Sequence, residues 1–158
     1  MYPVTNKDKC GISFPYGARY PYSNFFIQAK LAGKSHLGVD IAPYFKYKDE
    51  VFLIVAPVKG EIVFSGNNKA MGNMIGLLFT EGDVQMLHIV CHLGSIKSDI
   101  KKGVTVDKGT TLGTMGSTGN STATHLHYQV EIPGTKPNPT HWWIEGNWQS
   151  IDPKQFLT

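Results

Sequence analysis

The histidines of this sequence combine a residue type and a spacing that suit metal binding and proton transfer. His125 and His127 are two residues apart in Thr124-His125-Leu126-His127-Tyr128-Gln129. If this stretch is a strand, both imidazoles project from the same face. Such a pair suits one metal ligand beside one acid–base group, although two polar residues on a solvated face would have the same pattern.

A second group precedes it in the chain. His36 and Asp40 are four residues apart, but Gly38 and the following Val39-Asp40-Ile41-Ala42-Pro43 favour extended chain or a turn over a helix. Taken alone, this is also the pattern of a loop histidine beside an aspartate that makes an ordinary turn hydrogen bond. His92 ends an apolar stretch that begins at Met86.

Together these residues predict a zinc site. Zinc binds neutral imidazole nitrogens and carboxylate oxygens, and a catalytic zinc keeps three protein ligands and an open fourth position. His36, Asp40 and one histidine of the His125/His127 pair supply two nitrogens and one oxygen. His92 and the other member of the pair then remain for proton transfer.

The elements that must position these residues are predicted to be strands. Segments rich in Val, Ile, Phe and Leu are separated by Gly, Pro, Asn and Asp turns, and no stretch keeps a helical apolar period over ten or more residues. We predict an all-β fold, a small antiparallel sheet or barrel-sandwich domain. Residues 1–35 and 133–149 are expected to be long loops packed on the sheet. The predicted strands are 51–58, 61–65, 74–80, 84–93 and 125–132.

Composition limits the class of protein. The 158 residues suit a single domain, 1–158, and 41% hydrophobic with 17% charged residues excludes disorder. A net charge of +3 without a cluster of Lys and Arg predicts no nucleic-acid partner. No apolar run is long enough for a membrane span, and the N-terminus lacks the apolar core of a signal peptide. If the protein works outside the cell, we expect another export route or an excised domain.

Cysteine usage gives a further limit. Cys10 and Cys91 are the only cysteines, which excludes a disulfide-stapled scaffold and a Cys-rich zinc module. Two free thiols, with Cys91 buried in an apolar strand, are favoured over a Cys10–Cys91 bridge.

In order and spacing, a series of motifs resembles the lysostaphin/LytM-type zinc metalloendopeptidases, a family of peptidoglycan hydrolases. The resemblance covers about residues 15–153. The matching pieces are Tyr16-Gly17-Ala18-Arg19, His36-Leu37-Gly38-Val39-Asp40, Ala56-Pro57 with Gly60-Glu61-Ile62-Val63, Met71-Gly72-Asn73, Cys91-His92-Leu93, Lys108 to Gly113, Gly116 to Ser121, Thr124-His125-Leu126-His127 and Ile151-Asp152-Pro153.

The resemblance implies a small, mostly antiparallel β-fold with long loops that form a groove over the sheet. It also implies a role for each matched residue. His36, Asp40 and His127 would bind one Zn²⁺ per chain, and His92 and His125 would be the catalytic pair. It also implies an endopeptidase that hydrolyses cross-bridges or stem peptides of bacterial peptidoglycan with metal-activated water. It does not say which histidine is the general base or which peptide bond is cut.

Some positions depart from the family pattern or lie outside it. Val90 stands where the family often has Tyr, and Cys91 replaces a common Ala. Tyr20 and Tyr22 are both candidates for a family tyrosine near the metal. His88, four residues before His92, and His141 are expected to lie outside the site, although His88 could share the face of His92. The stretch with Trp142, Trp143 and Trp148 either shapes a substrate groove or caps the core.

The sequence is also compatible with two other functional contexts. The same fold could serve as a non-catalytic peptidoglycan-binding module or a phage tail structural part, although all five site positions are filled. A phage lysin or tail-associated enzyme, acting with other virion or lysin domains, would keep the chemistry and change only the setting. The expected location is extracellular, at the cell wall, or on a virion.

Overall fold

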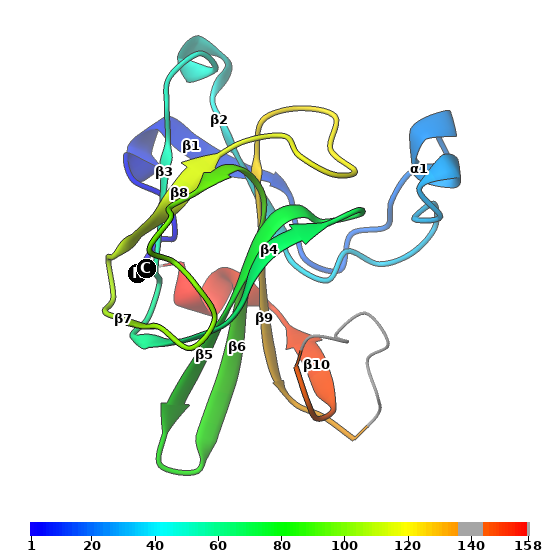
Figure 1. Cartoon of the computed structure of the whole chain (residues 1–158). Coiled ribbons are helices and arrows are strands. Elements are labelled where there is room, and N and C mark those ends of the chain that lie inside the picture. Colours follow the sequence, from blue (N-terminus) through cyan, green and yellow to red (C-terminus); the bar gives the residue numbers. More distant parts are fainter. Residues whose placement is uncertain (136–143, 158) are drawn as a thin grey trace.

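The computed structural model describes residues 1–135 and 144–157, and within these it is almost entirely strand and loop (Figure 1). One short α-helix and three 3₁₀ turns accompany the strands: α1 Asn24–Gln28, η1 Lys7–Lys9, η2 Phe45–Tyr47 and η3 Pro153–Phe156. The strands are β1 Cys10–Phe14, β2 Val39–Pro43, β3 Leu53–Val55, β4 Gly60–Asn68, β5 Gly72–Glu81, β6 Val84–Ile96, β7 Thr105–Val106, β8 Thr111–Met115, β9 Leu126–Pro133 and β10 Trp148–Ile151.

These strands confirm the predicted all-β, antiparallel class. Their hydrogen-bonded order is β1-β2-β9-β6-β5-β4-β7, with β10 on β9 and β8 bridging β6 and β3. Every pairing between named strands is antiparallel. Although β9 comes late in the chain, it lies between β2 and β6, and this brings the early and late site residues together.

The strands predicted from the sequence appear with changed ends. β4, β5 and β6 cover the predicted segments and extend beyond them, and β9 begins one residue later than predicted, at Leu126. The first predicted segment is reduced to the three residues of β3. The expectation that residues 1–35 are loop is wrong, because they contain β1 and α1. The end of the 133–149 stretch is also not loop, since β10 begins at Trp148 and pairs with β9. Both β1 and β10 are short, and β1 has no strict apolar alternation, so neither carries a strong strand signal.

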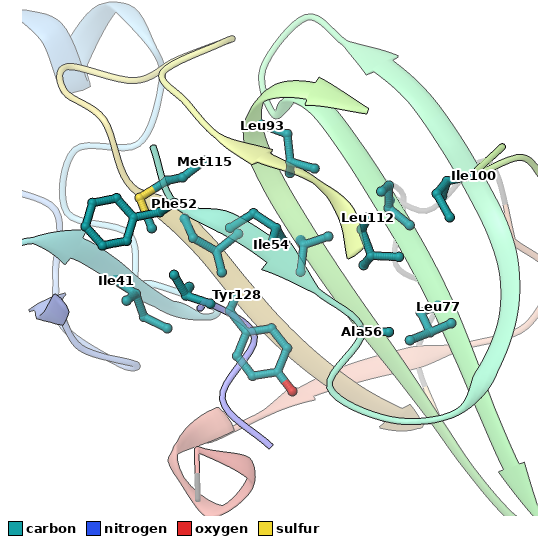
Figure 2. Close-up of a cluster of buried hydrophobic side chains, with 14 of the residues drawn as sticks. Ile41, Phe52, Ile54, Ala56, Leu77, Leu93, Ile100, Leu112, Met115 and Tyr128 are labelled. Carbon is teal, nitrogen blue, oxygen red and sulfur yellow. The ribbon is translucent and has the colours of Figure 1, made fainter. Parts of the chain in front are cut away.

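A buried apolar core fills the space between the long strands and the β3/β8 pair (Figure 2). Tyr128 on β9, Ile54 on β3 and Leu112 on β8 are at most 1% exposed. Alternation on β9 and β6 places Tyr128, Val130, His88 and Val90 towards this side of the sheet. Burial of these side chains is the main source of stability for a sheet of this size.

The opposite face of β6 and β9 carries the site. Cys91, Ile89 and Leu87 lie across from His127, Gln129 and Glu131 in register. A smaller buried cluster covers the apolar members of this face, and it includes Trp148 and Met74. The candidate metal site therefore lies at one end of a partly buried face.

Both cysteines are free and buried, as favoured from the sequence. Burial raises the pKa of the Cys10 thiol to about 11, and burial with the nearby Asp40 carboxylate raises that of Cys91 further above its usual range. Both are therefore protonated and unreactive at neutral pH. Among the described residues, no helix has the length and apolar character to cross a membrane.

Candidate metal centre

The sheet register places His127 at the middle of the site. On β9 it lies directly opposite Asp40 of β2 on one side and Cys91 of β6 on the other. Because side chains directly opposite each other in a sheet are close neighbours, this pairing alone brings the Asp40 carboxylate to the His127 ring.

His36 reaches the same point from the loop that leads into β2. Its backbone is held by hydrogen bonds from Gly17 N to His36 O and from His36 N to Ala18 O. A Cβ at Gly38 would meet Tyr128 O at 2.5 Å and the His127 ring at 2.8 Å. Glycine at this position therefore lets the loop pass close to β9, which explains its place between His36 and Asp40.

Three ligand atoms converge. His36 Nε2 and His127 Nδ1 are 2.9 Å apart, and both lie 3.0–3.1 Å from Asp40 Oδ1. Zinc bonds of about 2.0–2.1 Å in a tetrahedron separate ligand atoms by about 3.3–3.4 Å, so the three atoms fit one ion within a few tenths of an ångström. His36 Nδ1 donates to Pro15 O at 3.1 Å, which leaves its Nε2 lone pair for a cation.

The electrostatics of Asp40 also suit a cation. Burial by itself raises the pKa of this carboxyl, but its close contacts with the His127 and His36 rings outweigh burial and hold the pKa well below its usual range. Asp40 is therefore ionised at neutral pH. His36 and His127 are 1% and 5% exposed, so all three groups are largely removed from water.

His92 enters the site through a bulge in β6. Its φ is +62°, which is unusual for a residue with a side chain, and the β5–β6 register shifts between Asn73 and Ile75. Regular alternation would place His92 on the core side with His88; the bulge instead places its ring 4.8 Å from the ring of His125 and 6.0 Å from that of His127, measured between centroids.

His125 lies just before β9 and outside it, joined to Gly116 by an isolated bridge. Its Nε2 is 3.8 Å from Asp40 Oδ1, so it faces the metal centre beside His92. The expected strand geometry of His125 is therefore wrong in detail, but the structure brings it next to His127 as expected.

His92 and His125 are held in the same way. His92 Nδ1 lies 2.8 Å from Thr118 O, and His125 Nδ1 lies 2.8 Å from Ala123 O. Because a carbonyl only accepts, each Nδ1 carries a proton, and in the neutral form of each ring the lone pair is on Nε2. Burial, followed by the charges of His127 and His125, lowers the pKa of His92 to about 4. His92 is thus a neutral base at pH 7.

The remaining candidates lie in different places. His88 does not share the face of His92: it is 1% exposed, and its Nδ1 is 2.7 Å from the Tyr128 hydroxyl on the core side. Tyr20 lies beside the site, with its ring 5.4 Å from that of His36, whereas Tyr22 is 81% exposed. Trp148 is buried in the smaller cluster. His141, Trp142 and Trp143 lie outside the described residues.

An open hollow lies between α1 and the turn that joins β4 to β5. Its lining includes Lys30, Lys69, Ala70 and Asn120. Asn120 N donates to Ala70 O, so the hollow adjoins the same loop that supplies Thr118 to His92. It is the described feature that agrees best with the expected groove between loops.

Comparisons with known proteins decide the family. A model described as peptidase family M23 matches residues 34–139, which include all five site residues. The chain belongs to peptidase family M23. The catalytic domain of lysostaphin from Staphylococcus simulans has a similar structure, with a TM-score of 0.69 and 28% identity over 96% of this chain and 94% of that one.

Sequence relatives support the same family assignment. Lysostaphin from Staphylococcus simulans is 37% identical over 61% of this chain, and the DD-carboxypeptidase/endopeptidase Mpg of Neisseria meningitidis is 31% identical over 81%. The matched regions make up 18% and 26% of those two proteins, so this member of family M23 spans only a fraction of their length.

Sequence reasoning missed two polar residues of the site face, Gln129 and Glu131. They follow His127 at alternate positions on β9 and are 4% and 0% exposed. Their spacing of two residues from His127 was visible in the sequence, but polar residues that alternate along a strand usually form its solvated face. Only the observed burial shows that they belong behind the metal centre.

Proposed function

We propose that this protein is a zinc-dependent endopeptidase that hydrolyses peptide cross-bridges or stem peptides of bacterial peptidoglycan at the cell wall. The convergence of His36 Nε2, His127 Nδ1 and Asp40 Oδ1 on one point carries this proposal. Membership of a peptidase family supports the reaction type, and the names of the relatives support a peptide of the cell wall as substrate.

In this proposal His36, Asp40 and His127 hold the zinc ion of a single catalytic domain. When bound, zinc supplies a Lewis acid that polarises a carbonyl group and lowers the pKa of water. The carboxylate of Asp40 offsets part of the charge of the ion, and burial of the two imidazoles excludes competing water from the ligand atoms.

His92 and His125 are proposed to move the protons. In its neutral form, each ring presents an unprotonated Nε2 beside the proposed metal centre, because Nδ1 holds its proton for a backbone carbonyl. An imidazole in this state can accept a proton from water and return it to the leaving amine. Once protonated, either ring can also stabilise negative charge that develops on the carbonyl oxygen.

The test is mass spectrometry of fragments released from purified peptidoglycans that differ in cross-bridge, with and without a zinc chelator. We expect new peptide amino termini that disappear with chelator, and their sequence identifies the bond. Asp40→Ala is the control for contaminating hydrolases. Release of sugar reducing ends, or no release from any wall by zinc-loaded protein, would overturn the proposal in favour of a binding or tail-structural module.

A further inference from the structure

A row of buried polar side chains lies behind His127, beyond the five site residues. Gln129 and Glu131 follow His127 on the same face of β9, where their neighbours across the sheet on β6 are Ile89 and Leu87. An amide and a carboxyl group among apolar side chains cost free energy unless they are hydrogen-bonded, so apolar residues would be expected there. The free-energy cost of burying these polar groups suggests that they have a functional role.

The hydrogen bonds of this row have a definite order. His127 Nε2 lies 3.1 Å from Gln129 Oε1, on the side of the ring away from the metal centre. Gln129 Nε2 in turn donates to Glu131 Oε1 at 2.5 Å and to Ser150 Oγ at 3.0 Å. Ser150, directly opposite Glu131 on the neighbouring strand β10, donates to the same Glu131 oxygen at 3.0 Å.

This order determines the direction of every bond. Glu131 Oε1 accepts from both Gln129 Nε2 and Ser150 Oγ, and Gln129 Nε2 also donates to Ser150 Oγ, so both N–H groups of the Gln129 amide point towards Glu131 and Ser150. The Gln129 oxygen must then face His127, where it can only accept. The proton of the His127 ring is therefore on Nε2, and the lone pair is on Nδ1, the atom that converges with His36 and Asp40.

We propose that Gln129 is a positioning residue, oriented by Glu131 and Ser150, that fixes the tautomer and ring orientation of His127. Nδ1 of His127 thereby points towards His36 and Asp40 before a metal binds. Metal binding then does not have to supply the free energy of reorienting the His127 ring. This inference rests on the proposed function for the identity of the metal. Gln129 contacts Nε2 of His127 and not Nδ1, the atom that converges with His36 and Asp40.

The test compares zinc affinity, by competition with a chromophoric chelator, in three variants. Gln129→Leu removes the acceptor, and we expect zinc to bind about 10- to 100-fold more weakly. The double variant Gln129→Glu with Glu131→Gln reverses the pair but keeps the order, since the new carboxylate accepts from His127 and the new amide donates to that carboxylate; we expect affinity close to wild type. Ile89→Val loosens the same buried layer without touching the row and should bind zinc normally.

A second readout follows the His127 proton. In zinc-loaded protein with ¹⁵N-labelled histidine, the Nε2–H of His127 should exchange slowly with water in wild type, exchange faster in Gln129→Leu and exchange slowly again in the double variant. Melting with chelator present shows which variants fold. Wild-type affinity in Gln129→Leu, or a folded double variant that binds zinc more than tenfold weaker than wild type, would overturn the inference.

The two proposals fail differently. Wild-type protein that takes up no zinc would end the proposed metal centre and this inference together, before any variant is compared. Wild-type protein that binds zinc but releases no peptide would end only the proposed reaction. Equal zinc affinity in wild type and Gln129→Leu would end only the role of Gln129.

Discussion

At the scale of single residues, the ligand set and the histidine pair should give separable mutants. His36→Ala or Asp40→Ala removes one of the converging atoms, so we expect loss of zinc and of activity together. His92→Ala or His125→Ala leaves those atoms in place, so we expect zinc to stay bound while peptide release falls roughly 100- to 10,000-fold. Metal analysis after desalting and peptide-release rates check both. Near wild-type turnover in His92→Ala or His125→Ala would remove that residue from the proton-transfer role.

A second residue prediction concerns pH and the buried His88. Burial, followed by the nearby N-terminal charge, lowers the pKa of His88 from 6.5 to about 4. The unfolded chain therefore binds this proton first, and the free energy of unfolding falls as the pH drops from about 6.5 to about 4. In His88→Gln, which keeps a partner for Tyr128, the fall should be smaller by an amount on the order of 3 kcal/mol.

Urea unfolding of both proteins between pH 7 and 4 measures this difference. Because His92 contributes equally to both curves, subtracting one curve from the other isolates His88. Curves that stay parallel over the whole range would show that His88 does not titrate as its burial requires.

The types of the five site residues were predictable from sequence because their spacing is local or lies within matched motifs. The structure gathers all five, while their roles stay predictions. The sequence could not show which face of the sheet each side chain points to. His88 and His92 are an even number of residues apart, which on a regular strand means one face, and only the bulge separates them. Gln129 and Glu131 were missed for a similar reason, because alternation does not say which face is buried.

At the scale of elements, the bulge in β6 depends on a close approach between β5 and the loop that holds His92. Gly72 begins β5 with a φ of +66°, and a Cβ there would lie 2.4 Å from the backbone of Thr118. Thr118 also accepts from Asn73 N and donates to Leu93 O through its hydroxyl group. Glycine at this position thus lets one loop hold both sides of the bulge.

Gly72→Ala should therefore lower both stability and activity. Gly82 in the β5–β6 turn is a matched control, since its φ is +57° and nothing lies within 4 Å of the added Cβ. We expect Gly82→Ala to cost about 1 kcal/mol of stability and leave peptide release unchanged, and Gly72→Ala to cost more, because Thr118 must move away from His92. Chemical denaturation and peptide release measure the two effects. Equal behaviour of the two variants would contradict this role for Gly72.

Strands were predictable where many apolar residues alternate or run together, as in β5 and β6. They were not predictable where pairing depends on distant partners. β1 joins the sheet through β2, and β10 joins through β9, although the nearby sequence of each resembles loop. Such edge strands form because the neighbouring strand offers unpaired backbone groups, which a local pattern does not contain.

At the scale of the whole molecule, a bound ion would join the loop before β2 to β9. His36 and His127 are 91 residues apart in the chain. Since this cluster is not preset in the unfolded chain, zinc should bind the folded state and stabilise it by about 3 kcal/mol at a hundredfold excess over the dissociation constant. That corresponds to a rise in melting temperature of roughly 6–12 °C for a chain of this size.

Thermal melts with zinc and with chelator measure this rise, and Asp40→Ala is the control that should show little of it. A wild-type melting temperature that is the same in both conditions would contradict preferential binding of zinc to the folded chain.

The insertion of β9 between β2 and β6 also has a consequence for the order in which the protein is made. A ribosome releases β2, with Asp40, and β6, with His92, well before it reaches His127. Until then the two earlier strands have an empty position between them where β9 will pair. An unfinished chain therefore lacks His127 Nδ1 and the strand that pairs with β2 beside Asp40, so the proposed metal centre of a newly synthesised molecule is incomplete until β9 has been added.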